Sequence, residues 1–183
     1  MKLSHVLEPI RINKVEIKNR IFRPGHGTYF GRGVINDVVI AYHEARARAG
    51  VGLSTLEVVH VHPSTSANPT IYGWDDSVIP GFKRVAAAAH RHGMKLFSQI
   101  WHGGHHWPSV DGSPPWSCSD VPSPWGFVPN PMSCDQIGEI VQSFAATSVR
   151  ALEGGLDGVE LHFGHGYLVH NFFSPITNTR TDE

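Results

Sequence analysis

The feature that most constrains this chain is an alternation of short apolar runs with single amphipathic helices. The strand-like runs are a first one beginning at Ile21-Phe22, longer ones over Leu53 to Val59 and Lys95 to Ile100, and a short one over Val159 to Leu161. The first and the last are predicted to be buried. The predicted helices between them cover residues 37–49, residues 81–92 and the stretch after Ser133. Strands that alternate with single helices form a parallel sheet with right-handed crossovers, so the predicted fold class is α/β.

Each predicted helix carries a start signal and is followed by glycine. Asn36 is the N-cap of the first helix, and Pro80 immediately precedes the second. Ser133, with Gln136 three residues later, predicts a capping box at the start of the third. The apolar face predicted for the third helix consists of Ile137, Ile140, Val141, Phe144, Ala145, Val149 and Leu152.

The segments outside this alternation have their own signatures. Residues 9–20 alternate apolar and polar side chains around Asn13-Lys14, which predicts a β-hairpin with a two-residue turn. Residues 101–132 hold seven prolines and form a long loop within the domain. Loops of this length are usually lids or binding loops, and the tryptophans in this one favour packing over disorder. A further helix is predicted to begin near Tyr167.

The composition is that of an ordinary globular protein. Hydrophobic residues make up 40% of the 183 positions and charged residues 17%, which predicts one domain over residues 1–183. A net charge of −1 gives no electrostatic reason to bind nucleic acid or an acidic membrane. No signal peptide or membrane-spanning run is visible. The two cysteines, Cys118 and Cys134, match no metal or redox spacing, so we expect a reduced, cytoplasmic setting.

Polar side chains gather where the predicted strands end. The densest group is His162, His165 and Tyr167, just after the last strand-like run, with glycines between them that let the backbone turn sharply. Two loop histidines can equally be solvated or hydrogen-bonded residues without a function. The other strand ends contribute His26, Tyr29, Glu57, His60, Gln99, Trp101 and His102. Polar groups brought to one face by several parallel strands are typical of an active site in a barrel.

Two parallel architectures fit this order, an open doubly wound sheet and a closed barrel. An open nucleotide-binding sheet normally carries a glycine-rich phosphate loop after its first strand, but Pro24-Gly-His-Gly-Thr-Tyr does not match G-x-G-x-x-G. A TIM (β/α)8 barrel typically needs about 250 residues. We therefore predict about the first four βα units of such a barrel, preceded by the N-terminal hairpin.

Several segments together resemble one known family. The most specific is His162-Phe-Gly-His-Gly-Tyr-Leu, followed by Phe173-Ser-Pro-Ile-Thr-Asn-Thr-Arg-Thr-Asp-Glu. Tyr42-His-Glu-Ala-Arg-Ala-Arg-Ala-Gly and Ser98-Gln-Ile-Trp-His-Gly-Gly support it. They are similar to motifs of the old yellow enzyme family, the FMN-dependent NADH:flavin oxidoreductases that include 2,4-dienoyl-CoA reductases. The resemblance covers nearly the whole chain but only the N-terminal half of the family's barrel, so we expect the second half to be missing here.

The resemblance implies an FMN site across the carboxyl-end mouth of the barrel. Gly25, His26 and Gly27 are then expected to line the flavin through backbone contacts, and Val58 to lie near the edge of its ring. The Gln99 amide is expected to pair with the pyrimidine part of the ring, because an amide can both donate and accept.

The resemblance also implies roles for the last cluster. His162 and His165 match the pair that binds the oxygen of an activating carbonyl or nitro group on a small-molecule substrate. Tyr167 matches the tyrosine that protonates the substrate after hydride transfer, and Tyr29 matches a substrate-contacting tyrosine. NADH or NADPH is the implied reductant, and the implied reaction is reduction of the C=C bond in an enone or enoyl thioester.

Some positions depart from the family pattern and leave alternatives open. Gly27 stands where many members carry a side chain that tunes the flavin's potential. Arg23-Pro-Gly-His-Gly leans toward the family's amine dehydrogenases. An inactive fragment, or one that pairs with a second copy as a homo-oligomer, is another outcome. A metal-dependent hydrolase barrel would use the imidazoles of His102, His105, His106, His162 and His165.

Overall fold

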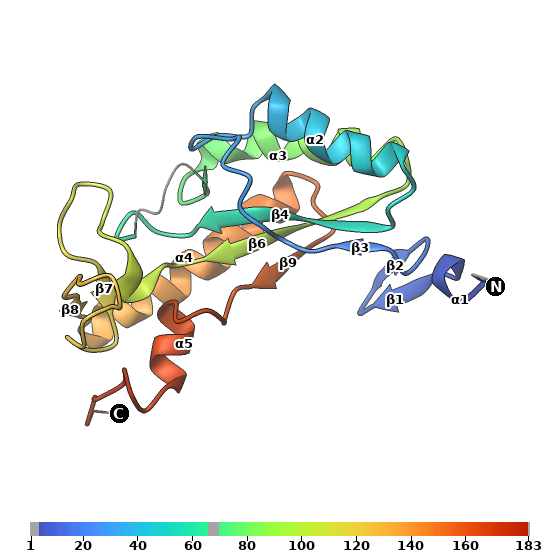
Figure 1. Cartoon of the computed structure of the whole chain (residues 1–183). Coiled ribbons are helices and arrows are strands. Elements are labelled where there is room, and N and C mark those ends of the chain that lie inside the picture. The colour runs from blue at the N-terminus through green and yellow to red at the C-terminus, as the bar shows by residue number, and fades with distance from the viewer. Residues whose placement is uncertain (1–3, 66–69, 183) are drawn as a thin grey trace.

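The protein is described by a computed structural model that covers residues 4–65 and 70–182. Its main sheet contains the parallel strands β3 (Phe22–Arg23), β4 (Leu53–His60), β6 (Lys95–Trp101) and β9 (Gly158–Leu161), in that order. The short strand β5 (Ile71–Tyr72) pairs with the end of β4. Figure 1 shows the strands side by side with their carboxyl ends at the same edge. The α/β alternation and the parallel sheet are therefore confirmed.

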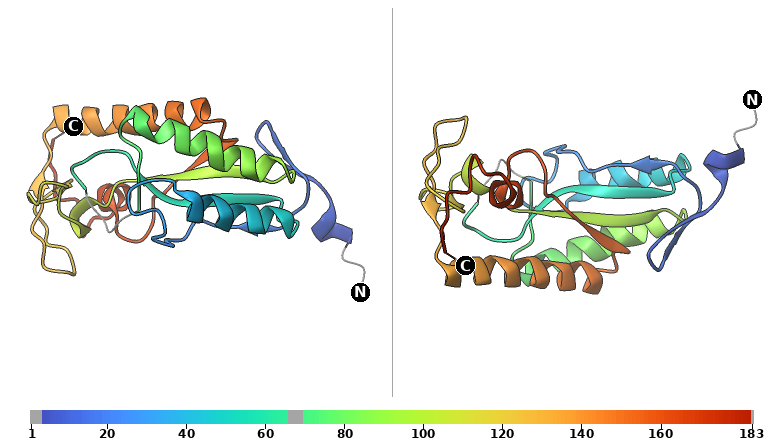
Figure 2. Two further views of the ribbon diagram at one scale, coloured as in Figure 1. Left: turned by 90° about the horizontal axis from the view of Figure 1, so that it is seen from above. Right: turned by 90° about the horizontal axis from the view of Figure 1, so that it is seen from below.

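Three helices cover one face of this sheet. They are α2 (Asp37–Arg48), α3 (Ile79–His90) and α4 (Cys134–Glu153), which lie side by side in Figure 2. The main core lies between them and the sheet and includes Val39 of α2, Phe82 and Val85 of α3, and Leu56 and Ile100 of the strands. The other face of the sheet, which would line the interior of a barrel, carries no such layer among the described residues.

The predicted helix starts are confirmed, with small shifts in the ends. The Asn36 side chain accepts from the backbone N–H groups of Val38 and Val39, as expected of an N-cap. Both hydrogen bonds of the capping box between Ser133 and Gln136 are present. Helix α3 begins at Ile79, two residues before the predicted position, because the turn η1 (Asp76–Val78) leads directly into it.

A β-bulge interrupts β4 where it pairs with β6. Thr55 lies opposite Phe97, but the next partners are Val58 and Gln99, so β4 has one residue more than β6 in this interval. The side-chain alternation of β4 therefore changes phase, and Leu56 and Val59 both face the helix layer although they are three residues apart. The bulge turns Val58 toward the opposite face, beside Gln99.

Three burial predictions were wrong. Phe22 in β3 and Leu161 in β9 are 47% and 48% exposed, because each lies on an edge strand with one open side in the described residues. On α4, Val141, Val149 and Leu152 lie in the apolar pattern but are more than half exposed, whereas Ile140 is buried. Val141, Val149 and Leu152 are on the outer side of α4, and no described segment packs over them.

The remaining segments frame the sheet. The predicted hairpin is confirmed as β1 (Ile10–Ile12) and β2 (Val15–Ile17), which follow the short helix α1 (Ser4–Leu7). The long loop contains a turn and two short strands, η2 (Gly104–His106), β7 (Trp116–Ser117) and β8 (Asn130–Pro131). Helix α5 (Leu168–Phe173) begins directly after Tyr167, as predicted. Among the described residues, no helix combines the length and apolarity needed to cross a membrane.

Candidate functional site

A cavity of about 250 Å³ opens at the carboxyl ends of the main-sheet strands. All nine residues that the sequence predicted for the site line it. They are Gly25, His26, Gly27, Tyr29, Val58, Gln99, His162, His165 and Tyr167. The structure therefore brings together side chains from four separate strand ends, while the chemical role of each residue stays a prediction.

Strand register explains much of this convergence. Gln99 of β6 lies between its neighbours Val58 of β4 and Glu160 of β9 in the parallel ladder. His162 directly follows β9, and its backbone N–H donates to the Ile100 carbonyl at 3.1 Å. Because parallel strands end at the same edge, residues far apart in the sequence meet there.

Gly25 makes room for the amide of Gln99. A Cβ atom at position 25 would lie 2.9 Å from both Cδ and Nε2 of Gln99, closer than van der Waals contact allows. The Gln99 amide can therefore lie flat against the backbone of the β3 loop only because residue 25 is glycine. Its Nε2 donates to the carboxylate of Glu160.

Backbone strain is concentrated around the cavity. Tyr29 and His165 have φ values of +58° and +57°, in the left-handed region that residues other than glycine seldom adopt. Both side chains line the cavity. Such conformations persist where the surrounding structure holds them, and they are commonly found at functional sites.

His162 and His165 form a hydrogen-bonded pair. Nε2 of His162 lies 3.2 Å from Nδ1 of His165. Burial and the neighbouring His165 lower the pKa of His162 to about 4, so this imidazole is neutral at pH 7. The Gly164 N–H points at Nδ1 of His162 at 3.4 Å, which places the His162 proton on Nε2 and directs it to His165. With Nδ1 of His165 accepting this proton, Nε2–H of His165 is the donor left for a ligand.

Tyr167 packs between this pair and two other rings. Its ring centroid lies 5.0 Å from that of His162, 4.9 Å from that of Trp101 and 5.3 Å from that of His106, all edge to face. Burial, with a smaller contribution from Tyr29, raises the pKa of the Tyr167 phenol. The phenol therefore holds its proton at neutral pH.

Thr70 and Trp107, which the sequence did not assign to the site, also line the cavity, and so does Trp101, which was expected among the strand-end side chains. Trp101 follows Gln99 on β6, and its buried indole Nε1 has no hydrogen-bond partner. Thr70 pairs with the buried His60 ring and leads into the two-residue strand β5, which has no sequence signal of its own. Trp107 belongs to the long loop. The tryptophan content of that loop was the only feature of the sequence that indicated a contribution to the site.

The histidines proposed as alternative metal ligands do not converge. Nε2 of His102 lies 2.9 Å from the Ser64 hydroxyl. Burial, with smaller contributions from His62 and His60, lowers the pKa of His102 to about 3. Nδ1 of His105 lies 3.2 Å from the Val121 carbonyl, and His162 pairs with His165. Within residues 4–65 and 70–182, no group of three or more potential ligands has the geometry to hold a metal ion.

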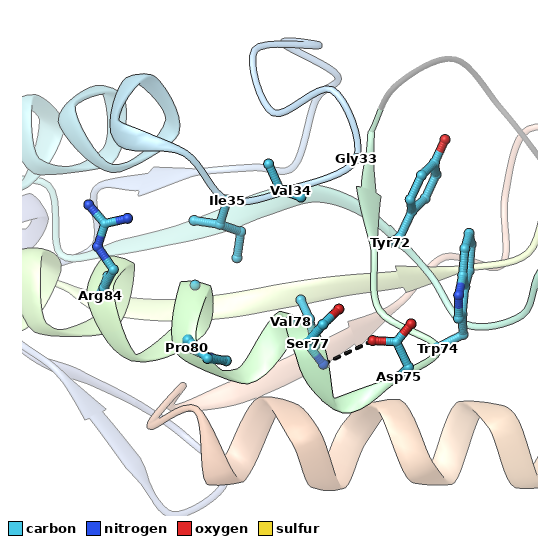
Figure 3. A pocket seen from close by; sticks show the side chains of 11 residues that line it. Gly33, Val34, Ile35, Tyr72, Trp74, Asp75, Ser77, Val78, Pro80 and Arg84 are labelled. Atoms are coloured by element: carbon cyan, nitrogen blue, oxygen red, sulfur yellow. Dashed lines mark hydrogen bonds between the residues drawn. The ribbon is translucent and has the colours of Figure 1, made fainter.

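A second cavity, of about 320 Å³, lies on the outer side between the loop before α2 and the start of α3. Figure 3 shows it bordered by Tyr72 and Trp74, whose rings stack with centroids 4.5 Å apart, and by Arg84 at the other end. It contains none of the predicted site residues. The cavity at the strand ends is therefore the candidate functional site.

Solved structures share this fold over nearly the whole chain. An old yellow enzyme homologue from Zymomonas mobilis is 27% identical, with a TM-score of 0.86 over 97% of this chain and 54% of its own. Morphinone reductase gives a TM-score of 0.88 at 24% identity, and this chain covers 52% of it. Histamine dehydrogenase from Rhizobium sp. 4-9 gives 0.88 at 25% identity, and this chain covers 29% of it. The fold is thus part of a TIM barrel of the old yellow enzyme type, as predicted.

Sequence comparison agrees with the structural one. NADH oxidase from Thermoanaerobacter brockii is 39% identical over 180 residues, which are 94% of this chain and 28% of that protein. NADPH dehydrogenase from Halalkalibacterium halodurans is 34% identical over 93% of this chain and 51% of that protein. The chain therefore spans about half the length of this dehydrogenase, and less of the oxidase. The family model for the NADH:flavin oxidoreductase / NADH oxidase family matches residues 5–183, and the chain belongs to that family.

Proposed function

We propose that this chain provides one side of an FMN site in an NAD(P)H-dependent oxidoreductase that reduces activated C=C bonds. The observation that carries the proposal is the convergence of nine predicted site residues on one cavity. Because the chain spans about half or less of its relatives, the proposal concerns the activity of the whole enzyme.

The described residues fit a flat, polar-edged ring. Gly25 and Gly27 place no side chain of their own in the cavity wall, and the Gln99 amide and the Tyr29 ring lie against them. Gln99 offers an amide at the same wall, and the Trp101 indole is a buried donor without a partner. When bound, FMN would accept a hydride from NADH or NADPH and pass it to the substrate.

The two imidazoles would hold the substrate's activating oxygen. Nε2–H of His165 is directed to no described acceptor, and Nε2–H of His162 becomes available once its bond to His165 breaks. Two donors at a carbonyl or nitro oxygen withdraw electron density from the conjugated C=C bond and stabilise negative charge that develops on the oxygen. The low pKa of His162 keeps it as a neutral donor.

Tyr167 would deliver the proton. Its phenol lies against the ring of His162, and its raised pKa keeps it protonated until a strongly basic carbon forms on the substrate. The substrate carbon that does not receive the hydride would take this proton, and bulk solvent would restore it.

Amine oxidation is the second candidate. The segment Arg23-Pro-Gly-His-Gly lines the cavity through Gly25, His26 and Gly27 and resembles the amine-dehydrogenase branch. The structural similarity to histamine dehydrogenase covers 98% of this chain. In that reaction a substrate amine would replace NAD(P)H as the source of the hydride.

Flavin titration tests the proposal. We expect added FMN to change its visible absorption and lose fluorescence on binding to the purified chain, and Gln99→Ala to weaken this binding by about tenfold. In the full-length enzyme, anaerobic NADH or NADPH should bleach the flavin, and an enone should restore its colour. Bleaching by an amine but not by NAD(P)H would select the second candidate, and a full-length enzyme that binds no flavin would refute both.

A further inference from the structure

The Gln99 amide of β6 is held on one side by the neighbouring strand β9 and on the other by the loop after β3. Across the β6–β9 pair, Gln99 lies opposite Glu160, and its Nε2 donates to the Glu160 carboxylate. On its other side, the amide lies against Gly25, with the Cβ position of residue 25 at 2.9–3.0 Å from Cδ, Nε2 and Oε1. Both Gln99 and Glu160 are partly buried.

The two ends of a glutamine amide have nearly the same shape but opposite hydrogen-bonding properties. The NH₂ end donates and the carbonyl oxygen accepts. An ionised carboxylate can only accept, so it selects the NH₂ end of the neighbouring amide. The Glu160 carboxylate, which accepts from the Gln99 Nε2, therefore decides which end of the Gln99 amide turns away from β9 and toward a ligand.

We propose that Glu160 is a positioning residue that orients the Gln99 amide, so that its carbonyl oxygen faces the ligand as an acceptor. The ligand chemistry that matches this orientation is a ring N–H flanked by carbonyl groups, as on the pyrimidine edge of a flavin. The identity of this ligand rests on the proposed function, whereas the orientation of the amide rests only on the contact between Gln99 and Glu160.

The orientation can be tested without any ligand. In ¹H–¹⁵N spectra of the purified chain, we expect the two Gln99 side-chain N–H signals to be well separated, because one proton is bonded to a carboxylate. Glu160→Leu should move them toward the positions of a solvated glutamine, whereas Glu160→Gln, which retains an acceptor oxygen, should move them less. Glu153→Gln, an exposed change on α4, is the matched control. Gln99 signals that are the same in wild type and Glu160→Leu would overturn the proposal.

Two flavins that differ at one ring nitrogen test whether the Gln99 carbonyl oxygen accepts a hydrogen bond from the ligand. Lumiflavin carries the ring N–H and 3-methyllumiflavin lacks it, and neither needs a phosphate-binding loop. We expect wild type to bind lumiflavin about tenfold more tightly than the methylated analogue, which is the effect of one hydrogen bond. In Glu160→Leu the amide can rotate, and the preference should fall below about threefold. In Glu160→Gln the new amide can pair with either end of Gln99, so the preference should fall to an intermediate value. Full discrimination in Glu160→Leu would contradict the proposal.

The two tests separate the orientation from the proposed function. If wild type binds neither flavin, flavin binding fails for this chain, and the Gln99 spectra still decide whether Glu160 orients the amide. If flavin binds but Glu160→Leu changes neither the spectra nor the preference, the proposed function stands and the positioning role is refuted.

Discussion

The backbone N–H of Tyr29 donates to the buried carboxylate of Glu57, with 2.9 Å between Tyr29 N and Glu57 Oε2. The same oxygen accepts from the Thr28 hydroxyl at 2.8 Å. Glu57 is 2% exposed. A carboxylate at the end of β4 thus holds the loop after β3 in the left-handed conformation that Tyr29 adopts.

Replacing Glu57 with Leu should destabilise this loop. The donors of Thr28 and Tyr29 would lose their acceptor in these part-buried hydrogen bonds, so we expect the free energy of unfolding to fall by about 2 kcal/mol. Glu57→Gln keeps an acceptor oxygen and should cost about 1 kcal/mol. Urea unfolding measures both, with the exposed change Glu153→Gln as control. Equal stability of wild type and Glu57→Leu would show that the loop does not depend on this carboxylate.

Gly25→Ala should weaken flavin binding without a comparable loss of stability. The new methyl group would meet the Gln99 amide at 2.9 Å and push it out of the wall of the cavity. We expect the Kd for FMN to rise by about tenfold or more. Gly138→Ala is the control, because nothing lies within 4 Å of its Cβ position on α4, and alanine should stabilise that helix by about 1 kcal/mol. Unchanged FMN affinity in Gly25→Ala would mean that the Gln99 amide is not part of the binding wall.

Acid should destabilise the fold through three buried histidines. Burial is the main cause that lowers the pKa of His43 to about 3, of His60 to about 4 and of His102 to about 3, from an ordinary value of 6.5. Above pH 6.5 these groups are neutral in both states and have no effect on stability. Below pH 6.5 the unfolded chain binds protons that the folded chain excludes, so stability falls as the pH drops toward 4.

This effect can be measured as proton uptake on unfolding. Near pH 5 the three histidines should account for roughly three protons taken up, apart from those of other groups. Urea unfolding between pH 7.5 and 5 gives the slope of the free energy of unfolding against pH. A flat free energy across this range would contradict the burial of neutral imidazoles.

Tyr167→Phe should separate the two halves of the reaction in the flavin-loaded enzyme. The change removes the proposed proton donor but leaves the ring packed on Trp101 and His162. We expect alkene reduction to slow by a factor of roughly 100 or more, while flavin reduction by NAD(P)H changes by less than about threefold. Stopped-flow spectroscopy follows both steps. Equal slowing of both would remove the assignment of Tyr167 as proton donor.

His165→Ala should weaken the binding of oxygen-bearing ligands. Its Nε2–H is the donor that the hydrogen-bonded histidine pair leaves free, and an anionic phenol such as 4-hydroxybenzaldehyde would accept from it. We expect the Kd of this phenol for the oxidised, flavin-loaded enzyme to rise by about tenfold. Unchanged binding in His165→Ala and His162→Ala would show that the pair does not hold the ligand's oxygen.

The sequence was sufficient for the parts of the fold that depend on local chemistry. Asn36 and the pair Ser133 and Gln136 make the cap contacts that their side chains predict. The residues predicted for the site also line one cavity, because parallel strands bring their carboxyl ends to one edge whatever the loops between them do. The resemblance to a known family added their expected roles.

Other features depend on contacts that no local pattern encodes. Val149 and Leu152 belong to an apolar pattern, but the pattern does not tell which segment covers them, and they are exposed. Thr70 reaches the cavity through a strand of two residues, too short to give a periodic signal. The bond between His162 and His165 depends on a left-handed turn at His165 that the neighbouring glycines only made plausible.

The extra residue in β4 lies between the part of the strand that packs under the helices and the part that lines the cavity. Before the bulge, Leu56 belongs to the helix-facing core, and after it Val59 does, with Val58 left free to face Gln99. The first part of the strand can therefore satisfy the packing of the helices while its end supplies a wall of the cavity. Removing Glu57 would restore simple alternation, with Leu56 and Val59 still toward the helices and Val58 still beside Gln99, but β4 would lose the carboxylate that holds the loop after β3.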